Sequence, residues 1–178
     1  MRIAMIIGGL AASLTMAAPA AAGDAFWRTF ADVGAIGIPV VATGIAIHEK
    51  DKNGLYQLAE TGFVALTSTE ALKYGVNSTR PNGGERSFPS THTSMAFAGA
   101  GFLHARYGWK VGLPFELLAA GVGAARIHTR DHHWYDVVAG AAIGEGSAFL
   151  LTRRLREDVQ VSMGGDTHGG MVSLSARF

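Results

Sequence analysis

Five apolar segments, all rich in small residues, constrain the fold of this chain more than any other feature. They cover residues 33–47, 63–72, 94–103, 111–125 and 137–151. Each is shorter than the roughly 18 to 20 apolar residues that a membrane-spanning helix needs. Pro39, Glu116 and Glu145 interrupt three of them, and an ionisable residue at the centre of a bilayer costs at least about 2.5 kcal/mol. The pattern therefore predicts a buried helical core, with a compact integral membrane bundle as the alternative.

The helical pattern covers most of the chain and predicts an all-α fold. Helices are expected near 33–47, 55–78, 90–107, 111–126 and 133–154, with a short separate lead-in at 25–30. The result is a compact bundle of about five to six helices that forms one domain over residues 23–156. Lys73, Asn77 and Arg80 are four and three residues apart, so they are predicted to share one face of a helix that ends before Pro81.

The tail from residue 157 to 178 has a different pattern. Val159, Val161 and Met163 alternate with polar residues, and the same alternation returns over 172–178 after a glycine-rich turn. A period of two on both sides of a turn is typical of a β-hairpin. Because a lone hairpin is marginal in water, the tail would have to pack on the bundle, pair with another chain or stay disordered.

The first 22 residues read as a secretory signal peptide. Arg2 is followed by an apolar run, and alanines precede Gly23 as signal peptidase requires. Cleavage after Ala22 would export the mature protein to the periplasm, where it could also associate with the membrane or insert into it. An uncleaved membrane anchor is the alternative.

Charge and cysteine content exclude several classes of function. Lys and Arg number 15 and Asp and Glu 14, so removal of Arg2 leaves a formally neutral protein. Without a basic excess, no nucleic-acid partner is expected. There is no cysteine, which excludes disulfides, thiolate catalysis and zinc–thiolate sites.

Three clusters between Lys73 and Asp136 carry the chemistry. They read KYGVNSTRP, FPSTH and ARIHTRDHHWYD, and they contain the spaced motifs KxxxxxxRP, PSxH and RxxxxxHxxxD. Lys73, Arg80 and Arg126 would supply the fixed positive charge that a phosphoryl group needs when no metal is present. Ser90 and Thr91 follow Pro89 at a predicted helix start, where hydroxyls and backbone N–H groups favour an anion.

This ordered set resembles the type 2 phosphatidic acid phosphatase superfamily, which also contains bacterial acid phosphatases and vanadium haloperoxidases. The resemblance covers about the middle third of the chain. It implies that His132 attacks phosphorus to form a phosphohistidine, that Asp136 holds the His132 tautomer, and that His92 is the general acid. The phosphate-binding residues that it implies are Lys73, Arg80, Ser90, Thr91 and Arg126.

Two residues depart from the family pattern, and one competing reading remains. Thr91 stands where the family has Gly in PSGH, and Ala125 stands where it has Ser. A metal centre is the competing reading, because five candidate ligands lie close together in sequence: His128, Asp131, His132, His133 and Asp136. Their spacing matches no common motif such as HExxH, and the three nearby cations would repel a divalent ion. No metal or cofactor is therefore expected.

The sequence thus favours a metal-independent phosphatase acting on a phosphomonoester or pyrophosphate, with a phosphorylated lipid as the favoured substrate. A soluble periplasmic acid phosphatase of broad specificity, acting on small phosphoesters, is the nearest alternative. A vanadium-dependent haloperoxidase is disfavoured because those enzymes are generally much larger. A non-catalytic anion-binding protein is disfavoured by the intact His92, His132 and Asp136.

Overall fold

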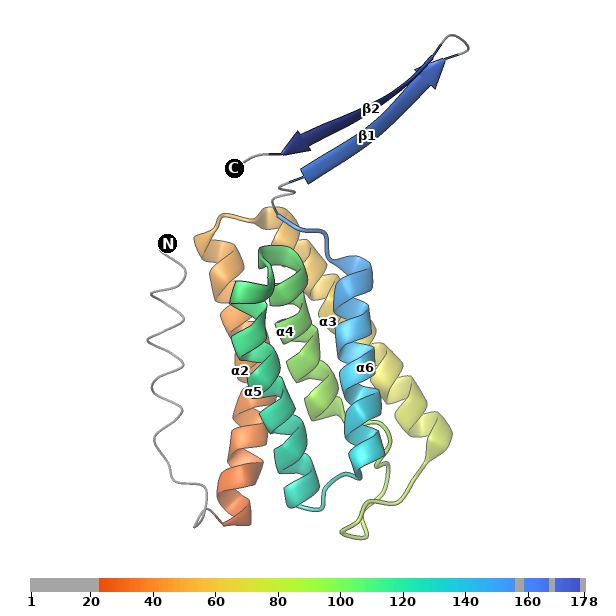
Figure 1. The fold of residues 1–178 in the computed structure, drawn as a ribbon. Helices are drawn as coiled ribbons and strands as arrows, with labels where there is room; N and C mark the ends of the chain where they lie inside the picture. The colour runs from red at the N-terminus through yellow and green to blue at the C-terminus, as the bar shows by residue number, and fades with distance from the viewer. Residues whose placement is uncertain (1–22, 156–158, 167–168, 177–178) are drawn as a thin grey trace.

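The computed structural model describes residues 23–155, 159–166 and 169–176. Its helical part is a single bundle in which long helices run along a common axis (Figure 1). The five helices are α2 (Asp24–His48), α3 (Lys52–Val76), α4 (Thr91–Tyr107), α5 (Trp109–His128) and α6 (Trp134–Leu151). Helix α4 is central, because it contacts each of the other four. The predicted all-α bundle is confirmed, whereas the predicted signal peptide lies outside the described residues.

Helix α2 corrects the prediction for the start of the domain. Residues 25–30 and 33–47 form one continuous helix of 25 residues, with Pro39 inside it. The hydroxyl of Thr43 donates a hydrogen bond to the carbonyl of Pro39 (2.9 Å), and Gly99 of α4 lies against the Pro39 backbone. Among the described helices, α2 is the one that is long and apolar enough to cross a membrane, judged by length and composition. The segment is therefore longer than its apolar core suggested.

The end of α3 also differs from the prediction. The helix stops at Val76, because Asn77 adopts a left-handed conformation with φ of 43° that terminates helices. Lys73 lies in the last turn of α3, but Arg80 belongs to the loop that follows. The expectation that both residues share one helical face was therefore wrong, and the loop rather than the helix positions Arg80.

The period-two tail corresponds to two strands. They are β1 (Val159–Asp166) and β2 (Gly169–Ala176). The strands pair antiparallel, and the register runs from Val159 opposite Ala176 to Asp166 opposite Gly169. The predicted boundary between the helical domain and the tail remains a prediction.

Glycines allow α6 to approach α4 at the end of the bundle that carries the motifs. A Cβ atom on Gly140 would lie 2.5 Å from the carbonyl oxygen of Ser90, and a Cβ on Gly144 would collide with the carbonyl oxygen of Ser94. Real Cβ atoms do not approach backbone oxygens this closely, so larger residues would push the two helices apart. Because Ser90 belongs to the PSxH motif, this contact also fixes the position of the candidate site.

Gly144→Ala is expected to lower the free energy of unfolding by about 1 to 3 kcal/mol, the usual cost of overpacking a close contact. Gly146→Ala is the matched control, since no heavy atom lies within 4 Å of its added Cβ. That variant should be neutral or slightly more stable. Thermal or denaturant unfolding of both variants measures the difference, and equal stabilities would refute the close contact.

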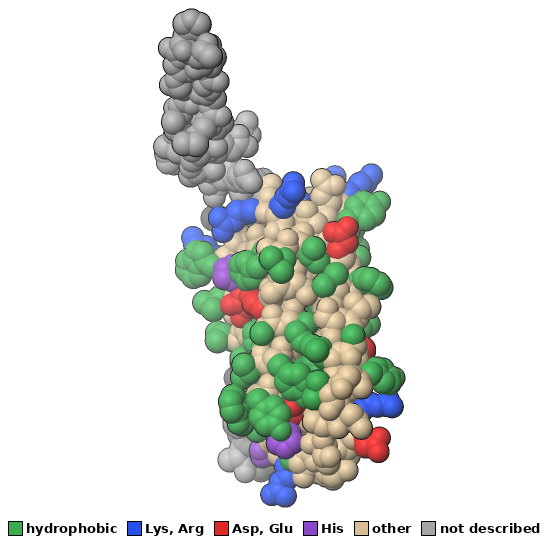
Figure 2. Space-filling view, turned by 90° about the vertical axis from the view of Figure 1, so that its right-hand side faces the viewer, with side chains coloured by type: hydrophobic (Ala, Val, Ile, Leu, Met, Phe, Trp, Pro, Cys, Tyr) green, Lys and Arg blue, Asp and Glu red, His purple; other side chains and the backbone are tan. Residues whose placement is uncertain are grey.

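The flanks of the bundle expose many large apolar side chains. Figure 2 shows hydrophobic groups spread along one flank, over most of the height of the helical part. They include Ile36 and Val40 on α2, Phe63 and Leu66 on α3, Leu113 and Leu117 on α5, and Phe149 and Leu150 on α6, all more than 36% exposed. Large exposed apolar side chains on four helices are typical of proteins that contact a membrane or another protein.

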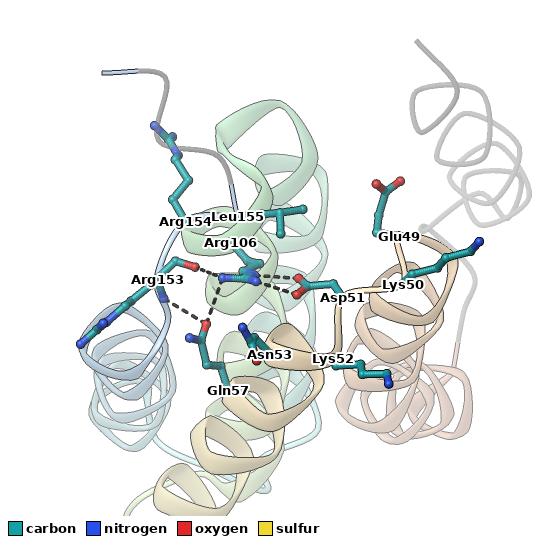
Figure 3. A pocket seen from close by; sticks show the side chains of 10 residues that line it. All are labelled: Glu49, Lys50, Asp51, Lys52, Asn53, Gln57, Arg106, Arg153, Arg154 and Leu155. Atoms are coloured by element: carbon teal, nitrogen blue, oxygen red, sulfur yellow. Dashed lines mark hydrogen bonds and ion pairs between the residues drawn. The ribbon is translucent and has the colours of Figure 1, made fainter. Parts of the chain in front are cut away.

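A polar network closes the end of the bundle opposite the motifs (Figure 3). Asp51, in the turn between α2 and α3, accepts two hydrogen bonds from the Arg106 guanidinium (2.6 and 2.7 Å). Tyr107 donates a third (3.0 Å), and Arg106 also donates to the backbone carbonyl of Arg153 (2.6 Å). A cavity of about 690 Å³ lies beside this network. The network therefore joins the α2–α3 turn to the ends of α4 and α6.

Candidate active site

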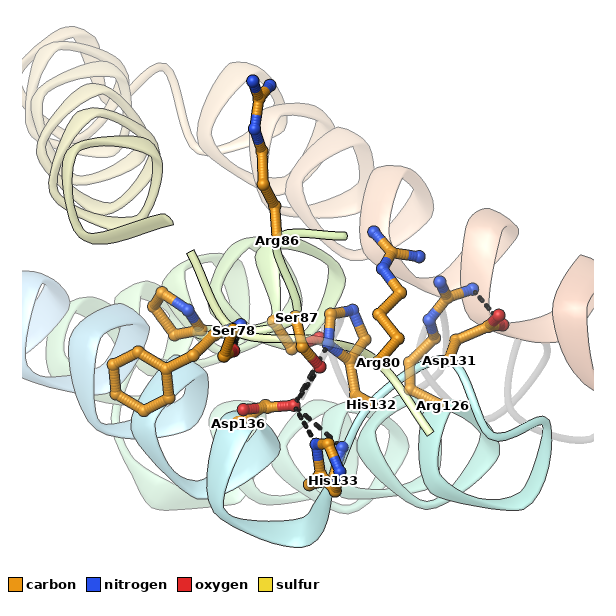
Figure 4. Close-up of polar contacts among 12 residues, drawn as sticks. Ser78, Arg80, Arg86, Ser87, Arg126, Asp131, His132, His133 and Asp136 are labelled. Atoms are coloured by element: carbon orange, nitrogen blue, oxygen red, sulfur yellow. Dashed lines mark hydrogen bonds and ion pairs between the residues drawn. The ribbon is translucent and has the colours of Figure 1, made fainter. Parts of the chain in front are cut away.

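The three sequence clusters meet at one end of the bundle, where the α3–α4 and α5–α6 connections lie (Figures 1 and 4). Lys73 comes from the end of α3, Ser90 and His92 from the start of α4, and Arg126 from the end of α5. His132 lies in the α5–α6 connection, and Asp136 lies in the first turn of α6. Residues separated by more than 60 positions are thus brought to one place.

His132 is buried at the centre of this site, with 2% of its surface exposed. Its backbone N–H donates to the carbonyl of Arg126 (3.1 Å), which fixes the short α5–α6 connection. Burial lowers the pKa of His132 to about 3, and the charges of Arg126, Arg80 and Lys73 act in the same direction. The surroundings of His132 therefore favour the neutral imidazole, which is the form a nucleophile needs.

Asp136 is fully buried and holds several groups at once. Its Oδ2 atom accepts hydrogen bonds from the Ser87 hydroxyl (2.5 Å) and the His133 backbone N–H (2.8 Å). Nδ1 of His132 lies 3.7 Å from the same oxygen, beyond hydrogen-bond distance. The reason is that α6 begins at Trp134, so Asp136 is the N3 residue of a capping box with His133.

This geometry refines the predicted pairing of His132 with Asp136. The two side chains are neighbours, but Oδ2 of Asp136 accepts from the backbone N–H of His133 and lies 3.2 Å from its ring Nδ1, whereas the His132 ring is farther away. Nδ1 of His132 and Oδ1 of Asp136 are both buried without a hydrogen-bond partner among the described residues. Catalytic hydrogen bonds are often long in unliganded enzymes and shorten in the substrate complex. Shortening the 3.7 Å contact to Asp136 would give Nδ1 of His132 a partner.

The three predicted cations differ in what holds them. Lys73 is 8% exposed, and its Nζ donates to the carbonyls of Pro89 (2.7 Å) and Arg86 (3.2 Å). Arg80 donates from Nε to the carbonyl of Glu85 (3.1 Å) within its own loop. Burial lowers the pKa of Lys73. Lys73 therefore also fixes the α3–α4 loop that carries Arg80.

Arg126 is buried, and Asp131 is the nearer of two acidic residues that face its guanidinium. NH1 lies 3.3 Å from Oδ2 of Asp131, as Figure 4 shows, whereas Nε is buried without a partner among the described residues. Burial lowers the pKa of Arg126, although the Asp131 carboxylate opposes this effect. A buried guanidinium with an unsatisfied N–H is well suited to donate hydrogen bonds to an oxyanion.

Ser90 and Thr91 occupy different positions at the start of α4. Ser90 is the N-cap, and its Oγ accepts from the backbone N–H (3.4 Å) and the hydroxyl (3.0 Å) of Thr93. The Thr91 hydroxyl donates to Glu70 Oε1 on α3 (2.8 Å). In this conformation the Thr91 side chain is directed to Glu70, so its contribution to anion binding would come from the backbone N–H at the helix N-terminus.

Asp32 and Ser87 are site residues that the sequence motifs did not identify. Asp32, on α2, lies 2.8 Å from His92 Nε2 and 3.9 Å from Arg126 NH1. Burial and the charge of Arg126 lower the pKa of His92, whereas its hydrogen bond to Asp32 raises it. Asp32 and Ser87 both lie outside the three motifs, and Asp32 is 60 positions from His92 in sequence.

Asp32→Asn is expected to move the alkaline limb of the activity profile to lower pH. If His92 must be protonated to act as the acid, kcat/KM falls as pH rises through the pKa of His92. Removal of the Asp32 carboxylate removes a group that raises this pKa, so the fall begins earlier and activity at neutral pH drops severalfold.

Profiles of kcat/KM against pH for Asp32→Asn and Asp24→Asn measure this effect. Asp24 is exposed on the same helix, 3.8 Å from His128, and its replacement should leave the profile unchanged. Coincident limbs in all three proteins would show that Asp32 does not act on the acid.

The residues of the alternative metal-centre prediction make contacts with other side chains. Asp131 faces Arg126 and Arg28, each at 3.3 Å, and accepts a hydrogen bond from Asn82 (2.9 Å). His128 packs against Trp27, and His133 stacks on Tyr135. Within the described residues, these side chains do not form a group of ligand atoms that could hold one ion.

One end of the helical bundle gathers a buried histidine and three cationic side chains, a combination of groups that suits an oxyanion. Residues 54–159 match the PAP2 superfamily, and the chain belongs to that superfamily. The resemblance read from the three motifs is thereby confirmed.

Individual relatives support the same family. The chain is 29% identical over 131 residues to the lipid A 4'-phosphatase of Helicobacter pylori, a match that covers 67% of this chain and 66% of that protein. It is 37% identical over 86 residues to a probable diacylglycerol pyrophosphate phosphatase of Schizosaccharomyces pombe, which covers 40% of this chain and 31% of that protein. The chain thus spans at most about two thirds of these relatives.

Among solved structures, LpxE of Aquifex aeolicus matches with a TM-score of 0.63 and 26% identity, over 76% of this chain and 87% of that one. A transmembrane PAP2-type phosphatidylglycerolphosphate phosphatase from Bacillus subtilis matches with a TM-score of 0.58 and 20% identity, over 84% of this chain and 92% of that one. At that identity, the second likeness shows the shared fold alone.

Proposed function

We propose that the protein is a phosphatase that removes a phosphomonoester or pyrophosphate group from a lipid phosphate, through a phosphohistidine intermediate and without a metal ion. The observation that carries this proposal is the buried, neutral His132 close to Lys73, Arg80 and Arg126. A neutral imidazole is nucleophilic, and three fixed cations can stabilise the negative charge on the transferred phosphoryl group.

The first chemical step forms the phosphoenzyme. Because Nδ1 of His132 faces Asp136, the other ring nitrogen, Nε2, would attack phosphorus. A P–N bond forms while the P–O bond to the leaving alcohol or phosphate breaks. The leaving oxygen takes a proton from His92, and the Asp136 carboxylate stabilises the positive charge that develops on the His132 ring.

The second step releases phosphate. His92 is now neutral and takes a proton from a water molecule, whose oxygen attacks phosphorus. The P–N bond breaks, and its electron pair returns to Nε2 of His132. Both histidines end in their starting protonation states, so the cycle balances without a further acid, base or metal ion.

A lipid substrate is favoured over a small soluble ester by two observations. The relatives include a lipid A phosphatase and a probable diacylglycerol pyrophosphate phosphatase. The bundle exposes apolar side chains along its flanks, and α2 has the length and composition of a membrane span. We infer a protein exported to the periplasm that works on lipids in the adjoining membrane. A soluble acid phosphatase of broad specificity is the second candidate.

Phosphate release by the purified full chain tests the proposal. The substrates are phosphatidic acid and diacylglycerol pyrophosphate in mixed micelles, and p-nitrophenyl phosphate as the soluble ester, each with and without EDTA. Release that survives a short EDTA treatment and favours the lipids supports the proposal. Preference for the soluble ester would favour the second candidate, and immediate loss in EDTA would refute metal independence.

A further inference from the structure

A second cluster of ionisable side chains lies outside the candidate active site. His104 on α4, Glu116 on α5 and Glu145 on α6 each direct one ligand atom to a common point, and these three atoms lie within 4.8 Å of one another. His104 lies 12 residues after His92 on α4, or roughly 18 Å along the helix axis. The cluster is therefore separate from the catalytic chemistry.

The two carboxylates of this cluster have His104 as their one basic neighbour among the described residues. His104 Nδ1 contacts Glu116 Oε1, but Oε2 of Glu145 is buried and has no hydrogen-bond partner among the described residues. No lysine or arginine in the described part of the chain forms an ion pair with either glutamate. Burial and the neighbouring Glu116 carboxylate raise the pKa of Glu145 to about 7, so this pair is stabilised either by protonation of Glu145 or by a bound cation.

Two glycines make room for the cluster. A Cβ atom on Gly101 would lie 2.8 Å from Oε2 of Glu145, and a Cβ on Gly112 would collide with His104. The backbone of α4 therefore gives Glu145 a place beside it, and the backbone of α5 does the same for His104. The three ligand atoms meet because α4, α5 and α6 pack closely, and the two glycines allow this close packing.

We propose that His104, Glu116 and Glu145 bind a divalent transition-metal ion, with zinc as the best fit. One imidazole nitrogen and two carboxylate oxygens suit zinc, whereas magnesium and calcium prefer ligand sets made of oxygen alone. Two carboxylates also balance the charge of a divalent ion. Tetrahedral zinc places its ligand atoms about 3.3 Å apart, so the ion would replace the direct His104–Glu116 contact, and small side-chain rotations would bring the three ligand atoms to that spacing.

Such an ion would have a structural role. The ligands come from three different helices, so the ion would hold α4, α5 and α6 together. The His104 and Glu116 side chains are 31% and 21% exposed, which leaves space for water as a fourth ligand. Because the site is remote from His132, removal of the ion should reduce thermal stability before it affects phosphate chemistry.

Zinc binding by the purified, metal-stripped full chain tests this site. Zinc chloride is added, excess is removed by gel filtration, and bound zinc is measured by mass spectrometry beside the melting temperature. Stoichiometric zinc and a melting temperature raised by about 5 °C or more are expected for the unmodified protein. Glu145→Gln and His104→Gln should lose both, while circular dichroism confirms that they are folded.

Three controls separate this site from other zinc ligands. Glu60→Gln and His48→Gln replace exposed residues of the same types and should keep the bound zinc. His132→Ala should also keep it, because the proposed site does not use the catalytic cluster. Zinc retained equally by all variants, zinc lost only from His132→Ala, or no zinc on the folded unmodified protein would each overturn the proposal.

Discussion

His132→Ala is expected to reduce kcat/KM for a lipid phosphate by at least about a thousand-fold, the scale seen when a covalent nucleophile is removed. Alanine leaves no nitrogen that can attack phosphorus, while Lys73, Arg80 and Arg126 remain to bind the phosphate. Substrate binding should therefore persist while the chemical step is lost. The measurements are steady-state phosphate release and, after denaturation at alkaline pH, covalent label from a ³²P-labelled substrate.

Two comparisons show whether the effect belongs to the nucleophile. His48→Ala, at an exposed histidine, should keep full activity. His92→Asn should still form the phosphoenzyme from p-nitrophenyl phosphate, because its leaving group needs little protonation. Hydrolysis of the phosphoenzyme should be slow in this variant. A burst of nitrophenolate and accumulated label would follow. If folded His132→Ala retains activity within tenfold, His132 is not the nucleophile.

The bundle could be predicted from the sequence because its cues are local. Apolar periodicity and polar turns located all five described helices, and the order of the motifs led to the superfamily. The errors occurred where one residue changed the backbone. Asn77 ends α3 through a left-handed conformation, and no apolar pattern indicates that Arg80 then enters the site from a loop.

Residues that act across helices could not be predicted in the same way. Asp32 approaches His92 only because α2 packs against α4, and Ser87 reaches Asp136 only because the α3–α4 loop folds over the start of α6. The same holds for His104, Glu116 and Glu145, whose sequence separations follow no ligand motif. Their positions are consequences of tertiary packing, for which a single sequence carries no local signal.

Arg106→Met is expected to lower the free energy of unfolding by about 3 to 5 kcal/mol, because it leaves the buried Asp51 carboxylate without its counter-charge. Both residues are 6% exposed, and the guanidinium makes two hydrogen bonds to the carboxylate. Arg153→Met is the matched control. Its side chain is exposed, and the backbone carbonyl that accepts from Arg106 is kept.

The pH dependence of the same variant identifies the cause. The hydrogen bonds from Arg106 hold the pKa of Asp51 below its usual value. The pair therefore stabilises the unmodified protein above the unfolded pKa of about 3.9, and this contribution is lost as pH falls through the lower folded pKa. In Arg106→Met, burial instead favours protonated Asp51. The stability difference should thus be largest near neutral pH and shrink in acid, and urea unfolding at several pH values measures it. A difference that is constant with pH would assign the loss to packing of the arginine stem rather than to the unpaired carboxylate.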